Sequence, residues 1–424
     1  MTPAVFPYKP GLELELHRHT PPDPFGSHNM IPYGRCTERL WNVYCNAPDY
    51  WDENRIQFAL EYPPIETKPP VAKGGRLTMT AKFVVHRVIE QSQRSSGGPT
   101  LLEGKFYRDR RFVRNAMAKV YDGVFYSVEG GYGYGYDAGH PDPMIQADLD
   151  YSIESAAYED IQTAGHCGSF TPQYYGSWTF SLETNEDGVT GTRQVRMILL
   201  EKVEGAQTMA EVIRKASTKQ EVSWYSGSDG WVLDRERLPP VKDRLKVLKN
   251  LLEAWDRIWW DAKVSHYHLS PEDVLIRQDN TVAIINFEQA TVYSWVERWG
   301  EPGDMQAYPD HPRYAKDAPS LQPNPLCLHW PFVRCSWPCR SPLVSAACWS
   351  HLPPIRKSRW WQWIPEDWVD NPELAAIWLL ETFKSADPNI YGPLPDSFLN
   401  SSEQKGRDLI KLLENLGRKK STSI

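Results

Sequence analysis

Polar and ionisable side chains gather on both sides of a short predicted β-hairpin. Two apolar runs, 274–276 and 282–285, are joined by the polar turn Arg277–Asn280, a pattern typical of a hairpin. An imidazole can accept a proton and carboxylates can hold a cation. Because a hairpin returns the chain to its start, we expect the flanking groups to face one pocket. They are His266, His268 and Asp273 before the hairpin, and Asn286 and Glu288 after it.

The elements that must position these groups follow from the periodicity of the apolar residues. An amphipathic helix is predicted over 241–262, leading directly into the hairpin. A second helix, with apolar residues at helical spacing, is predicted over 148–161. Segments rich in β-branched and aromatic residues predict strands before and after this second helix. These strands cover residues 77–89, 100–107, 114–121, 176–182 and 193–200.

The hairpin stretch resembles the protein kinase superfamily. Residues 266–276, H-Y-H-L-S-P-E-D-V-L-I, are similar to the catalytic loop H-R-D-L-x-P-x-N-V-L-I, and residues 284–288, I-I-N-F-E, to the strand that ends in D-F-G. The resemblance implies an α+β, bilobal protein kinase-like fold. It would have an irregular, Pro-rich extension over 1–75, a β-rich lobe with a hinge over 76–205, and a mainly helical lobe over 206–424.

The resemblance also implies a nucleotide site in the first lobe. Lys119 takes the place of the lysine that pairs with phosphates, with Lys105 as its rival, and Glu154 is the natural partner of Lys119. Solvated side chains remain the alternative for both Lys119 and Glu154. The remaining expected positions are Leu200 at the gatekeeper place and Glu201, Lys202 and Val203 in a hinge whose backbone would meet adenine.

The groups that perform phosphoryl transfer in the family are exchanged here. His268 stands at the catalytic Asp, Asp273 at the metal-binding Asn, and Asn286 at the metal-binding Asp. Asp273, Asn286 and Glu288 still offer oxygen ligands of the kind Mg²⁺ prefers. No G-x-G-x-x-G precedes Lys119. The resemblance therefore implies that ATP and Mg²⁺ binding is weakened and that fast catalysis is absent.

Composition narrows the class of protein further. The 424 residues carry a formal net charge of −7 and no apolar run long enough for a membrane helix, so we expect neither nucleic acid nor membrane as partner. Seven scattered cysteines suit a reducing compartment, the cytoplasm or the nucleus. The expected function is a pseudokinase that binds ATP and a protein partner. An active ATP-dependent phosphotransferase and a scaffold that binds no nucleotide are the alternatives.

Overall fold

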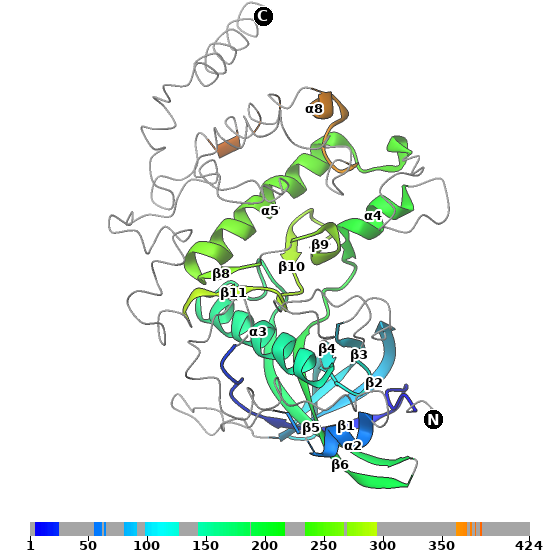
Figure 1. Cartoon of the computed structure of the whole chain (residues 1–424). Coiled ribbons are helices and arrows are strands. Elements are labelled where there is room, and N and C mark those ends of the chain that lie inside the picture. The colour runs from blue at the N-terminus through cyan, green and yellow to red at the C-terminus, as the bar shows by residue number, and fades with distance from the viewer. Residues whose placement is uncertain are drawn as a thin grey trace, which may run out of the picture. The chain divides into compact units, whose positions relative to one another are not determined.

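The computed structural model describes the chain in two separate units (Figure 1). Unit 1 comprises residues 1–204, 261–268 and 285–308, and unit 2 comprises the remaining residues. The residues that the structure describes are 5–24, 55–61, 63–64, 80–90, 98–126, 143–186, 188–216, 234–266, 269–294, 362–370, 374, 378 and 382–383.

Unit 1 is built on a closed six-stranded antiparallel barrel with the strand order β1-β2-β3-β4-β6-β5. Buried and exposed side chains alternate along β1, whereas β4 and β6 each contain a nearly continuous run of buried residues. In every strand, one face lines the interior. The strands are β1 (Glu13–Arg18), β2 (Thr80–Glu90), β3 (Thr100–Arg108), β4 (Arg111–Tyr121), β5 (Tyr174–Glu186) and β6 (Val189–Glu201).

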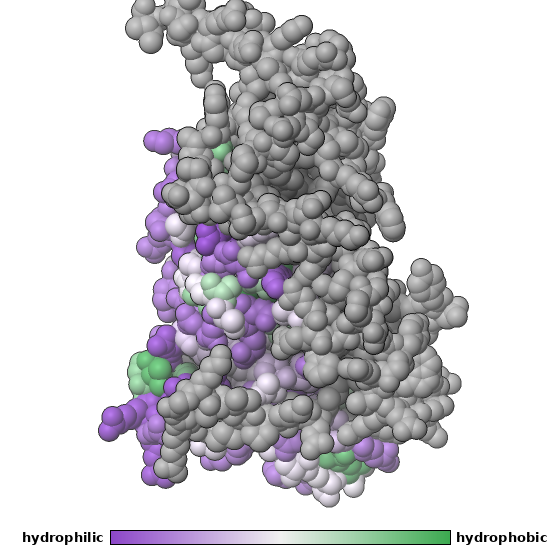
Figure 2. All heavy atoms as spheres, turned by 90° about the vertical axis from the view of Figure 1, so that its left-hand side faces the viewer, coloured by the Kyte–Doolittle hydropathy of each residue, from purple (hydrophilic) through white to green (hydrophobic). Residues whose placement is uncertain are grey.

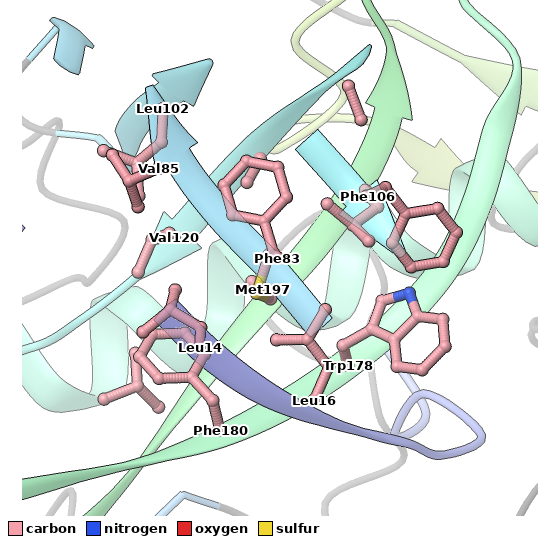
Figure 3. Close-up of a cluster of buried hydrophobic side chains, with 14 of the residues drawn as sticks. Leu14, Leu16, Phe83, Val85, Leu102, Phe106, Val120, Trp178, Phe180 and Met197 are labelled. Atoms are coloured by element: carbon pink, nitrogen blue, oxygen red, sulfur yellow. The ribbon is translucent and has the colours of Figure 1, made fainter. Parts of the chain in front are cut away.

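The barrel interior is a continuous apolar core. Figure 3 shows side chains from all six strands directed into it, with Trp178, Phe83 and Phe106 among the largest. The strands approach each other closely at Gly104, where an added Cβ would lie 2.3 Å from the backbone oxygen of Val84. A side chain at position 104 would therefore force β2 and β3 apart.

Strand β1 closes the barrel. Glu13–His17 pairs with β2, and His17 and Arg18 pair with Thr179 and Trp178 of β5. Its side chains alternate, with Leu14 and Leu16 buried in the core. Closure therefore depends on residues 13–18, although their sequence context predicts an irregular extension.

The prediction of a bilobal protein kinase-like fold with a mainly helical lobe is wrong. The strands form a closed barrel rather than part of a two-lobed architecture, and the part of the chain described here contains five α-helices. The physical reason is that residues 13–18 form a strand that pairs with β2 on one side and with β5 on the other, so neither edge of the sheet stays free. The prediction of an irregular extension fails at the same strand.

Two further helices and one small sheet complete unit 1. Helix α2 (Arg55–Glu61) is followed later by α3 (Pro143–Thr163), which begins five residues before the predicted start at 148. Pro143 suits the first position of a helix, where its missing N–H would have no partner. Strands β8 (Val264–Ser265) and β11 (Thr291–Val292) pair antiparallel.

Unit 2 contains the long amphipathic helix and the predicted hairpin. Helix α5 (Val241–Asp261) matches the prediction over 241–262 to within one residue. The hairpin is confirmed as β9 (Val274–Ile276) and β10 (Val282–Ile284), and β9 also pairs with β7 (Gln207–Thr208). Helices α4 (Met209–Lys215) and α8 (Glu366–Asp370) are the other described α-helices of the unit.

One face of the described surface is mainly polar. On the face drawn in Figure 2, hydrophilic residues predominate and hydrophobic ones occupy small separate areas. Within the described residues, no helix is both long and apolar enough to cross a membrane.

Candidate functional site

A buried lysine lies at the centre of a polar cluster inside unit 1. Strand β4 brings Lys119 to a position where its side chain is only 7% exposed, and α3 brings Glu154, which is fully buried. The Lys119 ammonium donates to both Glu154 carboxylate oxygens, at 2.8 and 2.6 Å. The structure thus brings together the two residues that the resemblance implied would pair.

Two residues after β10 complete the surroundings of Lys119. Its ammonium donates to Oδ1 of Asn286 at 3.1 Å and to Oε2 of Glu288 at 3.3 Å. Asn286 has a φ of +64°, a left-handed conformation that Asn tolerates better than most residues. All hydrogen-bonding directions of the ammonium are therefore directed to protein oxygens.

A tyrosine hydroxyl and a backbone N–H hold the Glu154 carboxylate in place. The Tyr121 hydroxyl donates to its Oε2, and the backbone N–H of Phe287 donates to its Oε1 at 3.2 Å. The Phe287 ring packs edge-on against Tyr158 with centroids 5.3 Å apart. This packing holds residues 286–288 close to Glu154, although they are distant in sequence.

The charges of Lys119, Glu154 and Glu288 shift one another's pKa values. Burial alone would lower the pKa of Lys119, but the Glu154 and Glu288 carboxylates outweigh burial and raise it. Burial raises the pKa of Glu154 against the opposing effect of Lys119, while Lys119 holds the pKa of Glu288 below its usual range despite burial. One cation between two carboxylates leaves an excess of negative charge.

A second buried carboxyl lies on the same helix. Asp150 accepts from the Tyr126 hydroxyl at 3.0 Å and from the Gln146 amide at 2.8 Å. Burial and the nearby negative charge of Glu288 raise the pKa of Asp150 well above its usual range. Ionisation of Asp150 is thus disfavoured, and the carboxyl contributes the two hydrogen bonds that it accepts.

The histidine before the hairpin also belongs to unit 1. His266 lies with its Nε2 2.7 Å from the Ile285 carbonyl oxygen, and its ring packs against Phe287 at 5.0 Å. It supports the loop that carries Asn286 and Glu288. His268, expected at the catalytic position, lies outside the described residues.

Asp273 belongs to unit 2. Its Oδ2 accepts from the Ser270 backbone N–H at 2.9 Å and from the Ser270 hydroxyl at 2.7 Å. These bonds tie the short turn before β9, so the observed role of Asp273 is structural. Among the described residues, no group of three or more His, Cys, Asp or Glu side chains is arranged to hold a metal ion.

The predicted hinge residues lie at the end of β6. Leu200 is buried, and the Glu201 backbone N–H already donates to the Gln173 carbonyl at 2.8 Å. Lys202 forms ion pairs with Glu103 at 3.0 Å and Glu204 at 3.1 Å. Val203 is half-buried. Lys105, the rival of Lys119, is exposed on β3.

Comparison with models of known protein families and with curated protein sequences finds no match for this chain. The function must therefore be argued from the Lys119 cluster itself.

Proposed function

We propose that this chain is a pseudokinase: it pairs a buried lysine with a helix glutamate as protein kinases do, but it transfers phosphoryl groups weakly or not at all. The observation that carries the proposal is the set of bonds around Lys119, which join it to Glu154, Asn286 and Glu288. A function belongs to a site rather than to a fold. The proposal therefore does not depend on the bilobal architecture.

The same bonds explain why catalysis would be weak. Phosphoryl transfer relies on cationic groups that neutralise the phosphates. The Lys119 charge is already compensated twice, by Glu154 and by Glu288. A phosphate that approaches Lys119 must displace Glu288, the partner whose side chain is 23% exposed, and it meets a net negative charge.

Weak nucleotide binding remains part of the proposal. Asn286 and Glu288 supply an amide oxygen and a carboxylate, and Mg²⁺ commonly takes one or two carboxylates together with water and substrate phosphates. Glu288 would then release Lys119 in order to hold the cation. His268 stays a predicted participant, as a proton acceptor.

The test measures ATP binding and phosphoryl transfer separately. Thermal unfolding with millimolar ATP and Mg²⁺ reports binding, and transfer of labelled γ-phosphate to water or to protein reports catalysis. Unmodified protein should show a small ATP-dependent stabilisation and no transfer above background. The stabilisation should disappear in Glu288→Gln, which lacks the carboxylate for Mg²⁺, and in Lys119→Met.

Lys105→Met is the matched control, because Lys105 is an exposed strand lysine of the same unit. It should bind ATP as the unmodified protein does. Rapid transfer that is lost in Lys119→Met would replace the proposal with an active phosphotransferase. Complete absence of ATP binding would leave a scaffold that binds no nucleotide.

A further inference from the structure

The β3–β4 hairpin extends beyond the strand next to it. Strand β4 pairs with β3 from Arg111 onward, but it pairs with β6 only from Ala116 to Tyr121. Within the described part of the chain, residues 111–115 thus have a strand on one side only, and all five side chains are exposed. We call this segment the β4 edge. Its backbone groups directed away from β3 are open to another extended chain.

The hairpin concentrates positive charge on a protein whose net charge is −7. One acidic residue, Asp109, lies among the basic ones. Neither the Arg110 side chain nor the Arg111 side chain has a hydrogen-bond or ion-pair partner among the residues described here. The basic residues in the part of the hairpin around its turn, 105–114, are Lys105, Arg108, Arg110, Arg111 and Arg114.

The turn of the hairpin keeps an arginine where glycine would be less strained. Asp109 and Arg110 have φ values of 50° and 62°, as a two-residue type I′ turn requires. Asp suits the first position, but the second strongly favours Gly. A non-glycine residue kept in a strained conformation is a reason to look for a functional use of its side chain.

Exposed apolar side chains distinguish the β4 edge from an edge strand whose charged residues only prevent pairing with other chains. Charged residues alone on an edge strand prevent unwanted pairing. Here Phe112 is 54% exposed and Val113 is 39% exposed, and these side chains would favour pairing. The Phe112 ring is steadied by an edge-on contact with Tyr107, with centroids 5.8 Å apart.

We propose that the β4 edge binds an extended, acidic segment of a partner protein by strand addition. The backbone of the segment pairs with residues 111–115, and its carboxylates pair with Arg110 and Arg111. Successive side chains of a strand alternate between its two faces, so carboxylates on the Arg111 face place the apolar side chains on the opposite face, against Phe112. Strand addition takes affinity from main-chain hydrogen bonds and specificity from alternate side chains. The site is separate from the Lys119 cluster, and it does not depend on nucleotide.

The test uses a fluorescent peptide of alternating Glu and Val, titrated with the full chain at low ionic strength. The Arg110→Glu/Arg111→Glu variant should weaken binding by about tenfold or more, because two attractive charges become repulsive. Phe112→Ser should weaken binding by loss of apolar contact. A peptide with the same side chains but N-methylated at alternate residues should not bind.

A matched double reversal, Lys9→Glu/Lys242→Glu, changes the net charge equally at exposed positions outside the hairpin. It should leave binding unchanged. Equal binding of the N-methylated peptide, or equal weakening by the control, would overturn the proposal. Preference for phosphatidylserine vesicles or a single-stranded oligonucleotide over the peptide would also overturn it.

A second variant separates charge from folding. Arg110→Gly removes the charge and relieves the left-handed strain. We expect its melting temperature to rise while its peptide affinity falls. A loss of affinity together with a lower melting temperature would instead assign Arg110 to the stability of the turn, against the proposal.

Discussion

The Lys119 cluster stabilises unit 1 only as long as its charges remain paired. We predict that Lys119→Met lowers the free energy of unfolding by about 3–5 kcal/mol, since it leaves buried Glu154 without its cation. Urea denaturation at neutral pH measures this loss. The double variant Lys119→Met/Glu154→Gln should recover a large part of it, because the carboxamide is uncharged, its oxygen can accept from the Phe287 backbone N–H, and its amino group can donate to the Tyr121 hydroxyl oxygen.

Lys105→Met again serves as the control. Lys105 is exposed, so its substitution should change the free energy of unfolding by about 0.5 kcal/mol or less. If Lys119→Met proved as mild as the control, Lys119 would not be part of a buried charge cluster.

A buried histidine predicts a pH dependence of stability. His19 lies with its Nε2 2.9 Å from the Tyr151 hydroxyl, and burial, followed by the Arg196 charge, lowers its pKa to about 3. In the unfolded chain the pKa is near ~6.5. The folded state therefore binds this proton less well, and stability falls as pH decreases from about 6.5 toward 3. At pH 5 the loss from His19 alone is about 2 kcal/mol.

His19→Gln should remove this part of the pH dependence, because the amide does not titrate and can still form a hydrogen bond with the Tyr151 hydroxyl. His17→Gln, an exposed change two residues earlier on β1, should retain the dependence of the unmodified protein. Urea denaturation at pH 7 and pH 5 compares the three proteins. Parallel pH profiles for His19→Gln and the unmodified protein would contradict the prediction.

At the scale of residues, the sequence predicted contacts that local pattern or chain order could indicate. Lys119 and Glu154 were chosen by their order on a strand and a helix, and they lie in contact. The bond from Lys119 to Glu288 was missed, since no periodicity relates residues 169 apart. The Tyr126–Asp150 bond was missed for the same reason, because burial of a carboxyl depends on packing.

At the scale of elements, strand β1 is the one on which closure of the barrel depends. Leu16 is fully buried in the core. We predict that Leu16→Ala lowers the free energy of unfolding by about 2–5 kcal/mol, the range for truncation of a buried leucine. Chemical denaturation measures the change.

Glu15→Ala, on the exposed face of the same strand, should change stability by about 0.5 kcal/mol or less. A Leu16→Ala variant as stable as Glu15→Ala would mean that residues 13–18 are not part of the folded barrel.

The sequence contained the signal for β1, but the surrounding composition obscured it. Glu13-Leu14-Glu15-Leu16-His17-Arg18 alternates in the way an exposed antiparallel strand does. Prolines on both sides favoured an irregular segment instead. The β9–β10 hairpin was predicted correctly because a turn and both strands lie within a few residues.

At the scale of the whole molecule, the architecture depends on pairings that no local pattern encodes. The barrel closes where His17 pairs with Thr179. The sequence predicted the strand that carries Thr179, but it predicted an irregular extension around His17. The two units are likewise assembled from separate stretches of chain, with residues 261–268 and 285–308 returning to unit 1. Motif order alone therefore indicated a bilobal fold that the structure does not have.

The division into units makes a prediction about cooperative unfolding. Within unit 2, the buried Arg244 guanidinium donates to the carbonyl oxygens of Trp363, at 2.6 Å, and Ile364, at 3.0 Å. Arg244→Leu leaves both carbonyls without this donor, which should cost about 3 kcal/mol. Hydrogen exchange should then accelerate in α5 and in residues 362–368 but remain unchanged in β4 and β6.

Lys242→Leu, an exposed change on the same helix, should leave hydrogen exchange unchanged in every segment. Equal acceleration in the barrel strands of Arg244→Leu would show that both units unfold as one body.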